Sequence, residues 1–229
     1  MRTEQRGGKR ERDDYNSEEF QGAAKHAITN KQGFKWTYRA YSMLDPYEKD
    51  WPETPDTEKT WIIDQIPEGL GLDIGCGHMK HREDAVGVDL TPAGTSGWAG
   101  GQRGAVSVAD VVADANDLPQ ETNSQDYVIA SHLLEHMIDP IASLDEWNRV
   151  LKIGGRLILV VPDEDLKSTI PMDSTHLHAF TARSLTKLLL RMGGWTVDEV
   201  AHEGQFSLCI TATKVPVKAW TPGEPITCA

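Results

Sequence analysis

The feature that most constrains the fold is an alternation of short apolar segments with helical patterns along residues 56–213. One segment, residues 156–161 (RLILVV), is almost continuously apolar, which is typical of a strand buried on both faces of a sheet. The last two apolar segments are joined by only four residues, so they can pair only as a hairpin. We therefore predict an α/β fold with a doubly wound, mostly parallel seven-stranded sheet and a terminal antiparallel hairpin. The predicted strands cover residues 69–74, 85–90, 106–113, 126–131, 156–161, 196–201 and 206–213.

Residue types that begin and end helices mark three helical segments. Asp56 is an N-cap residue for a helix over residues 56–66. Asp139, followed by Pro140 at the first helical position, predicts a second helix that the glycine pair at 154–155 would end. Thr181 predicts the start of a third helix, which the next glycine pair would end.

Composition limits the function. The chain has 229 residues, with 23 Lys and Arg against 35 Asp and Glu, and a net charge of −12. This acidic balance argues against non-specific nucleic acid binding. No apolar run reaches the ~18 residues of a membrane span, and the first residues lack the apolar core of a secretory signal. The three cysteines are an odd number without metal-ligand spacing, which favours a reducing cytoplasm.

We expect four parts along the chain. Residues 1–20 are rich in charge and are predicted to be a disordered tail. Residues 21–60 are rich in aromatic side chains and are predicted to pack on the core or to form a lid over the site. Residues 61–215 hold the α/β domain, and residues 216–229 are a Pro-rich, irregular tail.

Three aspartates lie at the ends of successive predicted strands. Asp73 precedes a glycine-rich turn at residues 75–77, Asp89 ends the second strand, and Asp114 ends the third. Glycines let the backbone turn tightly and approach a ligand, and ligands of parallel sheets bind at the carboxyl ends of strands. Asp89 can accept hydrogen bonds from a ribose diol, and Asp114 from an adenine amino group. Each aspartate alone is as easily a loop cap, but three along one edge favour a binding role.

Five motifs occur in a fixed order over about residues 70–213, namely LDIGCG, GVDL, ADANDLP, DYVIASHLLEHMIDP and RVLKIGGRLILVVPD. Their order resembles class I S-adenosylmethionine-dependent methyltransferases. The resemblance implies a Rossmann-like methyltransferase fold and S-adenosyl-L-methionine as cofactor. It assigns Asp89 to the ribose, Asp114 with Ala115 to the adenine, and Ser131 with His132 to the border of the methionine moiety and the reacting methyl. The cofactor-binding residues that it implies are Asp73, Gly75, Cys76, Gly77, Asp89, Leu90, Asp114, Ala115 and Ser131.

The glycine-rich segment departs from the usual pattern of the family. The third glycine is missing, and only eleven residues, 78–88, separate Gly77 from Asp89. The first helix is therefore expected to be short or absent, which resembles a subgroup with GCG and a short basic loop. His78, Lys80 and His81 are candidates for holding the cofactor's carboxylate, or else they are solvated loop residues.

A competing motif overlaps the fourth of these segments. His132, Glu135 and His136 spell H-x-x-E-H, a zinc signature when both imidazoles share one helix face, and His176 or His178 would be a third ligand. His132 directly follows a predicted strand, before a regular helix begins, which breaks that spacing. A zinc hydrolase is therefore the second alternative function, and we predict no metal site.

The segment after the fifth strand carries the predicted catalytic residues. Residues 173–181 (DSTHLHAFT) resemble a stretch of the same subgroup and are expected over the same sheet edge. We predict His176 as base or orienter, helped by Asp173, with His132 beside the reacting methyl. His176 can equally cap a helix or bind backbone, and methyl transfer can run on alignment alone. Cys76 is expected to pack and to have no nucleophilic role.

The predicted function is methyl transfer to an oxygen or nitrogen of a small-molecule, sugar or nucleoside acceptor in the cytoplasm, without a membrane partner. The first alternative is a non-catalytic S-adenosylmethionine-binding partner subunit, which the missing third glycine keeps open. A nicotinamide enzyme is disfavoured because the spacing after Gly77 does not fit the helix that such a site needs.

Overall fold

The structure of the protein is a computed structural model that describes residues 27–29, 35–37, 57–97, 105–171 and 173–217. The predicted charged tail at residues 1–20 lies outside the described residues, as does nearly all of the C-terminal tail. Of the aromatic extension, only two short strands and the first residues of a helix are described. The expectations for those parts stay predictions.

The centre of the fold is a mostly parallel sheet. Seven of its strands run in the order β10-β11-β9-β8-β3-β4-β7, and β2 and β1 extend it beyond β10. Strands β9, β8, β3, β4 and β7 are parallel neighbours, whereas β11 lies antiparallel between β9 and β10. This confirms the predicted doubly wound sheet with its terminal hairpin. The strands are β1 (Ala27–Thr29), β2 (Lys35–Thr37), β3 (Gly71–Ile74), β4 (Val86–Asp89), β7 (Val111–Val112), β8 (Gln125–Ser131), β9 (Leu151–Pro162), β10 (Trp195–Glu203) and β11 (Ser207–Lys214).

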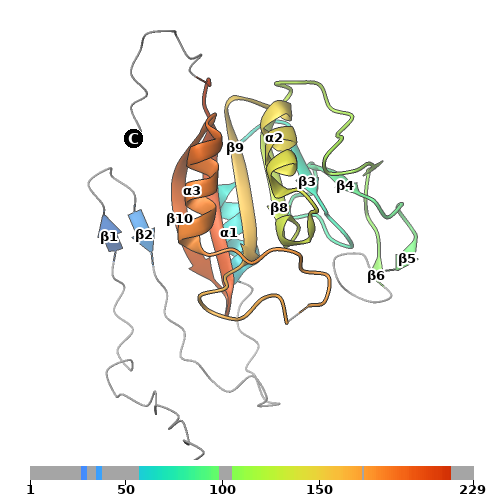
Figure 1. Cartoon of the computed structure of the whole chain (residues 1–229). Coiled ribbons are helices and arrows are strands. Elements are labelled where there is room, and N and C mark those ends of the chain that lie inside the picture. The colour runs from blue at the N-terminus through green and yellow to red at the C-terminus, as the bar shows by residue number, and fades with distance from the viewer. Residues whose placement is uncertain (1–26, 30–34, 38–56, 98–104, 172, 218–229) are drawn as a thin grey trace, which may run out of the picture.

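Helices cover both faces of the sheet (Figure 1). Helices α2 (Pro140–Val150) and α3 (Ala182–Met192) lie on one face, and α1 (Thr57–Gln65) lies on the other. Alternation along β8 divides its side chains between two cores, because Val128 belongs to the cluster with α2 and α3 while Ile129 belongs to the cluster with α1. The predicted burial on both faces is confirmed for residues 157–161 of β9, whose side chains alternate between the same two clusters, whereas Arg156 is only half-buried.

The predicted helix starts at Asp139 and Thr181 are confirmed, Asp56 lies outside the described residues, and one predicted helix end is wrong. The side chain of Asp139 accepts hydrogen bonds from the first turn of α2, and Thr181 forms a capping box with Ser184 at the start of α3. Helix α2 ends at Val150, before the glycine pair, because Leu151 is already extended and pairs with Gln125 of β8. Gly154, with φ of +82°, instead bends the early part of β9 where its register against β8 shifts.

The predicted strand over residues 106–113 is also wrong in extent. Only Val111–Val112 pair with β4, while β6 (Ala105–Val106) pairs with β5 (Ser96–Gly97) in a separate small sheet. The residues between them bond to backbone that is distant in the sequence, since the amide of Val108 donates to Gly77 in the turn after β3 and the amide of Asp110 donates to Gly87 in β4. The tertiary contacts of this segment therefore outweigh its apolar sequence pattern.

The connection between β3 and β4 contains turns and no helix, as the eleven-residue spacing predicted. The carboxyl ends of β3, β4, β7, β8 and β9 meet along one edge of the sheet. The loop from β9 to α3 leaves from this edge (Figure 1). Among the described residues, no helix combines the length and the apolarity that crossing a membrane requires.

Candidate functional site

The glycine-rich turn after β3 brings backbone to the edge of the sheet. Gly75 has φ of +70° and Gly77 has φ of +54°, a conformation that suits glycine. The amide of Gly75 donates to the carbonyl of Val88 at 2.7 Å, which ties the turn to β4. A Cβ at Gly75 would come within 3.1 Å of Leu133, so the turn also packs closely on the segment after β8.

Asp89 connects this turn to the end of β4. One carboxylate oxygen accepts from the amide of Gly77 at 2.9 Å, and the other accepts from the amide of Thr91 at 2.8 Å. A carboxylate oxygen has two lone pairs, so each can take a further hydrogen bond. Asp89 is therefore oriented by backbone donors and still able to accept from a vicinal diol.

A pocket opens at the ends of β3 and β4 and at the segment after β7. Five of the nine predicted cofactor-binding residues line it, namely Gly75, Asp89, Leu90, Asp114 and Ala115. Asp114 is exposed, and one of its oxygens accepts from the amide of Asn116 at 2.9 Å. The remaining lining residues are Ile74, Val88, Ala113, Leu133 and Met137. Sequence reasoning missed Leu133 and Met137, although they follow β8 at the edge where ligands of parallel sheets bind.

Asp73 does not line the pocket but supports the turn beside it. It is 1% exposed, and one oxygen accepts from the amide of His81 at 2.7 Å and lies 3.0 Å from Nδ1 of its ring. Lys80 is also engaged within the protein, because its ammonium donates to the Asp110 carboxylate and to two backbone carbonyls. Of the three basic candidates, only His78 has a buried ring nitrogen, Nδ1, without a hydrogen-bond partner among the described residues.

Cys76 and Gly77 lie in the turn without lining the pocket. Burial, reinforced by the charges of Asp73, Asp89 and Asp110, raises the pKa of the Cys76 thiol to about 12. A thiol with that pKa is a poor nucleophile at neutral pH, in line with the packing role predicted for it.

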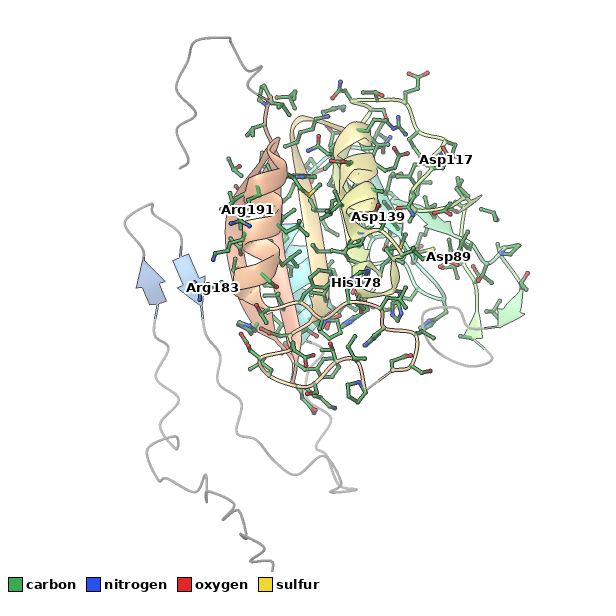
Figure 2. The ribbon with its side chains drawn as sticks, viewed as in Figure 1. Asp89, Asp117, Asp139, His178, Arg183 and Arg191 are labelled. Atoms are coloured by element: carbon green, nitrogen blue, oxygen red, sulfur yellow. The ribbon has the colours of Figure 1, made fainter. Side chains whose placement is uncertain are left out.

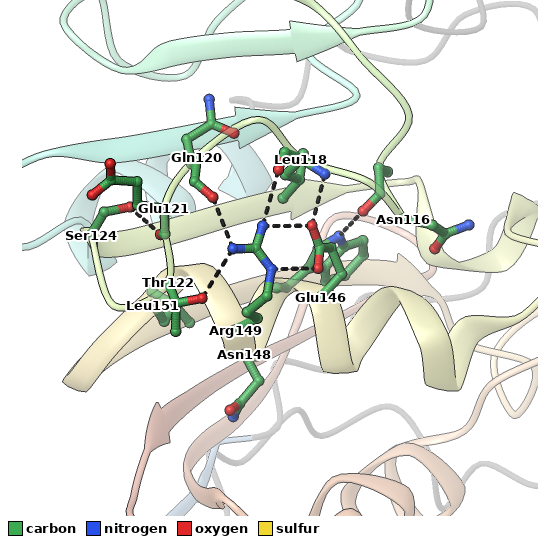
Figure 3. A network of polar contacts seen from close by, with 12 residues as sticks. Asn116, Leu118, Gln120, Glu121, Thr122, Ser124, Glu146, Asn148, Arg149 and Leu151 are labelled. Atoms are coloured by element: carbon green, nitrogen blue, oxygen red, sulfur yellow. Dashed lines mark hydrogen bonds and ion pairs between the residues drawn. The ribbon is translucent and has the colours of Figure 1, made fainter.

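A network of polar contacts holds the chain that follows Ala115 (Figure 3). The Arg149 guanidinium forms two hydrogen bonds with Glu146 and donates to the carbonyls of Leu118 and Gln120. Glu146 in turn accepts from the amide of Leu118 at 2.7 Å. The indole of Trp147 donates to the carbonyl of Ala115 at 3.1 Å. Helix α2 therefore fixes the segment that supplies the Asp114 side of the pocket.

Ser131 and His132 end β8 and face helix α1. Nε2 of His132 lies 3.1 Å from Glu58, which also accepts from Ser207 and from Ser131. Burial alone lowers the pKa of His132, but the carboxylates of Glu135 and Glu58 outweigh this effect and raise it to about 10. A raised pKa favours the charged imidazole, which has no lone pair to accept a proton, so His132 is better placed to pair with these carboxylates than to act as a base.

A second cluster lies next to the pocket, where the loop from β9 to α3 meets the short 3-10 helix η3 (Leu134–His136). Glu135 and His136 come from η3 and His176 comes from the loop, and their ligand atoms all lie within 4.8 Å of one another. Figure 2 shows His178 on the same loop and Asp89 at the end of β4. His132, with φ of +50°, precedes η3 and does not share a helix face with His136, which confirms the expected break in the H-x-x-E-H spacing.

His176 is buried, as a base or orienter would be, but its ring does not bond to the Asp173 carboxylate. Its Nδ1 lies 2.8 Å from the carbonyl of Thr169, and the Asp173 carboxylate accepts from the amide and hydroxyl of Thr175. Hydrogen bonds from Thr175 lower the pKa of Asp173. The hydroxyl of Thr175 also lies 3.0 Å from Nδ1 of His136, so Asp173 orients His136 through Thr175.

These features define a Rossmann-like α/β protein whose edge pocket suits a nucleoside-containing ligand. Asp89 and Asp114 place two carboxylates at the pocket, and the other lining residues are mostly apolar. The profile of the family described as "Methyltransferase domain" matches residues 72–159, from β3 to β9. Over these residues the chain is similar to S-adenosylmethionine-dependent methyltransferases, and solved methyltransferases share its fold.

The chain is also similar to parts of curated proteins. A malonyl-[acyl-carrier protein] O-methyltransferase of Alcanivorax borkumensis is 34% identical over 114 residues, which are 44% of this chain and 39% of that protein. An uncharacterized 37.1 kDa protein in a Streptomyces fradiae transposon is 28% identical over 167 residues, which are 68% of this chain and 47% of that protein. The chain spans less than half the length of each of these curated relatives.

Solved structures share the fold. One is a putative methyltransferase of Haloferax volcanii in a complex with the Trm112 methyltransferase activator, with a TM-score of 0.52 and 16% identity, covering 69% of this chain and 88% of that one. Another is a possible histamine N-methyltransferase of Thermotoga maritima, with a TM-score of 0.51 and 20% identity, covering 69% and 87%. The alternative of a zinc hydrolase finds no support in the family or in the conformation of the H-x-x-E-H segment.

Proposed function

We propose that the chain transfers a methyl group from S-adenosyl-L-methionine to an oxygen or nitrogen of a small-molecule, sugar or nucleoside acceptor. The observation that carries this proposal is the pocket in which Gly75, Asp89 and Asp114 meet at the ends of neighbouring strands. The bound cofactor would supply a sulfonium-activated methyl, so the protein need only align the acceptor and exclude water.

Each side of the pocket has a separate role in this proposal. Asp89, held by two backbone amides, accepts from the ribose hydroxyls, and Asp114 accepts from the adenine amino group. Gly75 allows the close approach of backbone, and Leu133 with Met137 closes the pocket from the β8 side. His78 is the basic residue that we assign to the cofactor's carboxylate.

The acceptor would enter beside the segment that follows β8 and under the loop after β9. His176 faces this region with Nε2, because Thr169 occupies Nδ1. That nitrogen can accept a proton or bind a cation, but not both at once. A net charge of −12 supports an acceptor other than bulk nucleic acid, and buried, reduced Cys76 and Cys209 support a cytoplasmic setting.

A calorimetric titration with S-adenosylmethionine and S-adenosylhomocysteine tests the proposal. We expect 1:1 binding by the wild type and a loss of at least about tenfold in affinity for Asp89→Ala and for Asp114→Ala, since each removes hydrogen bonds to a charged acceptor. Asp117→Ala is the matched control, because Asp117 is a neighbouring exposed aspartate outside the pocket lining. Circular dichroism checks that each variant folds.

An absence of binding by the wild type, or equal binding by all variants, would contradict the assigned pocket. Binding without turnover on any acceptor of the three classes would favour the alternative of a non-catalytic partner subunit.

A further inference from the structure

We propose that Glu135, His136 and His176 form a binding site for a divalent transition-metal ion, with Zn²⁺ as the ion that their donor atoms favour. The proposal stands on the geometry of this cluster and does not depend on the methyl transfer proposed above.

The first observation is a buried carboxylate without a hydrogen-bond partner. Glu135 is 1% exposed, and neither of its oxygens has a hydrogen-bond partner among the described residues. A buried carboxylate that accepts no hydrogen bond is normally neutralised by a cation, either a protonated side chain or a metal ion. Oε1 lies 3.4 Å from Nδ1 of His132, 3.8 Å from Nε2 of His136 and 4.0 Å from Nε2 of His176.

The second observation is the orientation of the two histidine rings. Nδ1 of His136 lies 3.2 Å from the carbonyl of Thr175, and Nδ1 of His176 lies 2.8 Å from the carbonyl of Thr169. A carbonyl can only accept, so Nδ1 carries the proton in both rings and Nε2 carries the lone pair of the neutral form. In metal-binding histidines, the ring nitrogen that does not bind the metal donates a hydrogen bond of this kind, which fixes the orientation of the ring.

The donor spacing also suits a metal. Ligands bound at 2.0–2.2 Å around a tetrahedral ion lie about 3.4 Å apart. The separations of 3.8 and 4.0 Å from Oε1 need a closure of a few tenths of an ångström, and the whole set of ligand atoms, which lies within 4.8 Å, would draw together around the ion. Two imidazoles and one carboxylate are the donors of catalytic zinc sites, whereas Mg²⁺ and Ca²⁺ prefer oxygen donors alone.

The surroundings allow a fourth ligand from outside the protein. The His136 side chain is 31% exposed, so the cluster opens to solvent on that side. Leu133 and Met137, which flank Glu135 and His136 in the sequence, line the proposed cofactor pocket. An acceptor oxygen bound to this ion would therefore lie beside that pocket, and His176 would act as a ligand in place of the base predicted from the sequence.

The rival explanation is that Glu135 is neutralised by protonated histidines alone. His132 is the strongest candidate, because it lies closest to Oε1 and also contacts Glu58. In that case the cluster needs no ion, and the protein would show no affinity for a metal at these residues.

Equilibrium dialysis with Zn²⁺ and titration with Co²⁺, followed by its visible absorption, distinguish the two explanations. The experiment uses the whole chain without a histidine tag, after treatment with a chelator. We expect one ion per chain, and Co²⁺ bands of a four- or five-coordinate site with nitrogen ligands. Glu135→Gln, His136→Ala and His176→Ala should each weaken binding at least about tenfold.

His178→Ala is the matched control, because His178 lies on the same loop but outside the cluster and should leave affinity unchanged within about twofold. Glu135→Gln keeps the shape of a buried side chain, and His136→Ala removes a partly exposed one, so a folding defect in one variant leaves the other informative. Stoichiometric binding lost in the cluster variants but kept in His178→Ala supports the site. No binding by the wild type, or binding equal in all variants, overturns it. S-adenosylmethionine titration of the same samples shows whether the proposed function stands without the metal.

Discussion

The rings of His136 and His176 meet edge to face, with centroids 4.7 Å apart and planes inclined by 63°. One ring comes from η3, directly after β8, and the other comes from the loop that follows β9. This contact therefore joins the segment that follows β8 to the loop that follows β9, at one edge of the sheet. The backbone adds to it, because the amides of Leu177 and His178 donate to the carbonyl of Glu135 at 2.8 and 3.1 Å.

An ion bound between these segments should stabilise the folded chain. We expect Zn²⁺ at a hundredfold excess over its dissociation constant to add about 2.7 kcal/mol to the free energy of unfolding, because the ligands come together only in the folded state. Thermal unfolding with and without Zn²⁺ measures this effect. His176→Ala should lose the rise in midpoint and His178→Ala should keep it, whereas equal rises in both would place the ion elsewhere.

Gly75→Ala should weaken both stability and cofactor binding. A Cβ at residue 75 meets Leu133 at 3.1 Å, and φ of +70° disfavours any side chain. Gly94→Ala is the control, because its φ of +75° carries the same backbone cost, of about 1 kcal/mol, while no atom lies within 4 Å of its Cβ. Denaturant unfolding and calorimetry should show a larger loss of stability and a selective loss of affinity for Gly75→Ala. Equal behaviour of the two variants would refute the role of the close contact.

Glu146→Gln should make the domain less stable at neutral pH by about 1–3 kcal/mol, because it breaks charge-assisted bonds to Arg149. Hydrogen bonds from Arg149, opposed by burial, lower the pKa of Glu146 below its usual 4.5. The carboxylate therefore stabilises the fold above the ordinary pKa of glutamate, and this contribution is lost as pH falls through the lowered value. Unfolding free energies measured from neutral to acid pH should converge for wild type and variant. If the two unfolding free energies still differed at acid pH, the loss of the charged bonds to Arg149 would not explain the lower stability of the variant.

Asp73→Asn should weaken cofactor binding indirectly, by loosening the glycine-rich turn after β3. The buried carboxylate accepts from both the amide and the ring of His81, so we expect a loss of about 1–3 kcal/mol in unfolding free energy together with weaker cofactor binding. Asp114→Ala, at an exposed position, should weaken binding with little change in stability. Measuring both quantities for both variants separates support of the turn from contact with the ligand. Unchanged stability in Asp73→Asn would contradict this account.

Much of the fold could be predicted from the sequence because its signals are local. Asp139 and Thr181 carry capping chemistry, and the apolar run at residues 156–161 is long enough to mark a central strand. Residues 107–110 were misassigned because their hydrogen-bond partners are distant in the sequence, at Gly77 in the turn after β3 and Gly87 in β4, which periodicity cannot reveal.

The site was predicted in part for the same reason. Asp89 is the last residue of β4 and Asp114 lies two residues after β7, and topology brings them to one pocket. The role of Asp73 could not be predicted, because its partner, His81, depends on how the turn folds back. The meeting of Glu135 and His136 with His176 depends on a loop crossing from β9, although the residue types were visible in the sequence.

The central claim is that the pocket at the ends of β3 and β4 holds S-adenosylmethionine. A crystal structure of the protein with S-adenosylhomocysteine tests it most directly. We predict the ribose hydroxyls on the Asp89 carboxylate, the adenine amino group on Asp114, and the sulfur on the side of Leu133 and Met137. A ligand bound away from Asp89 and Asp114, or an empty pocket at saturating ligand, would contradict the account.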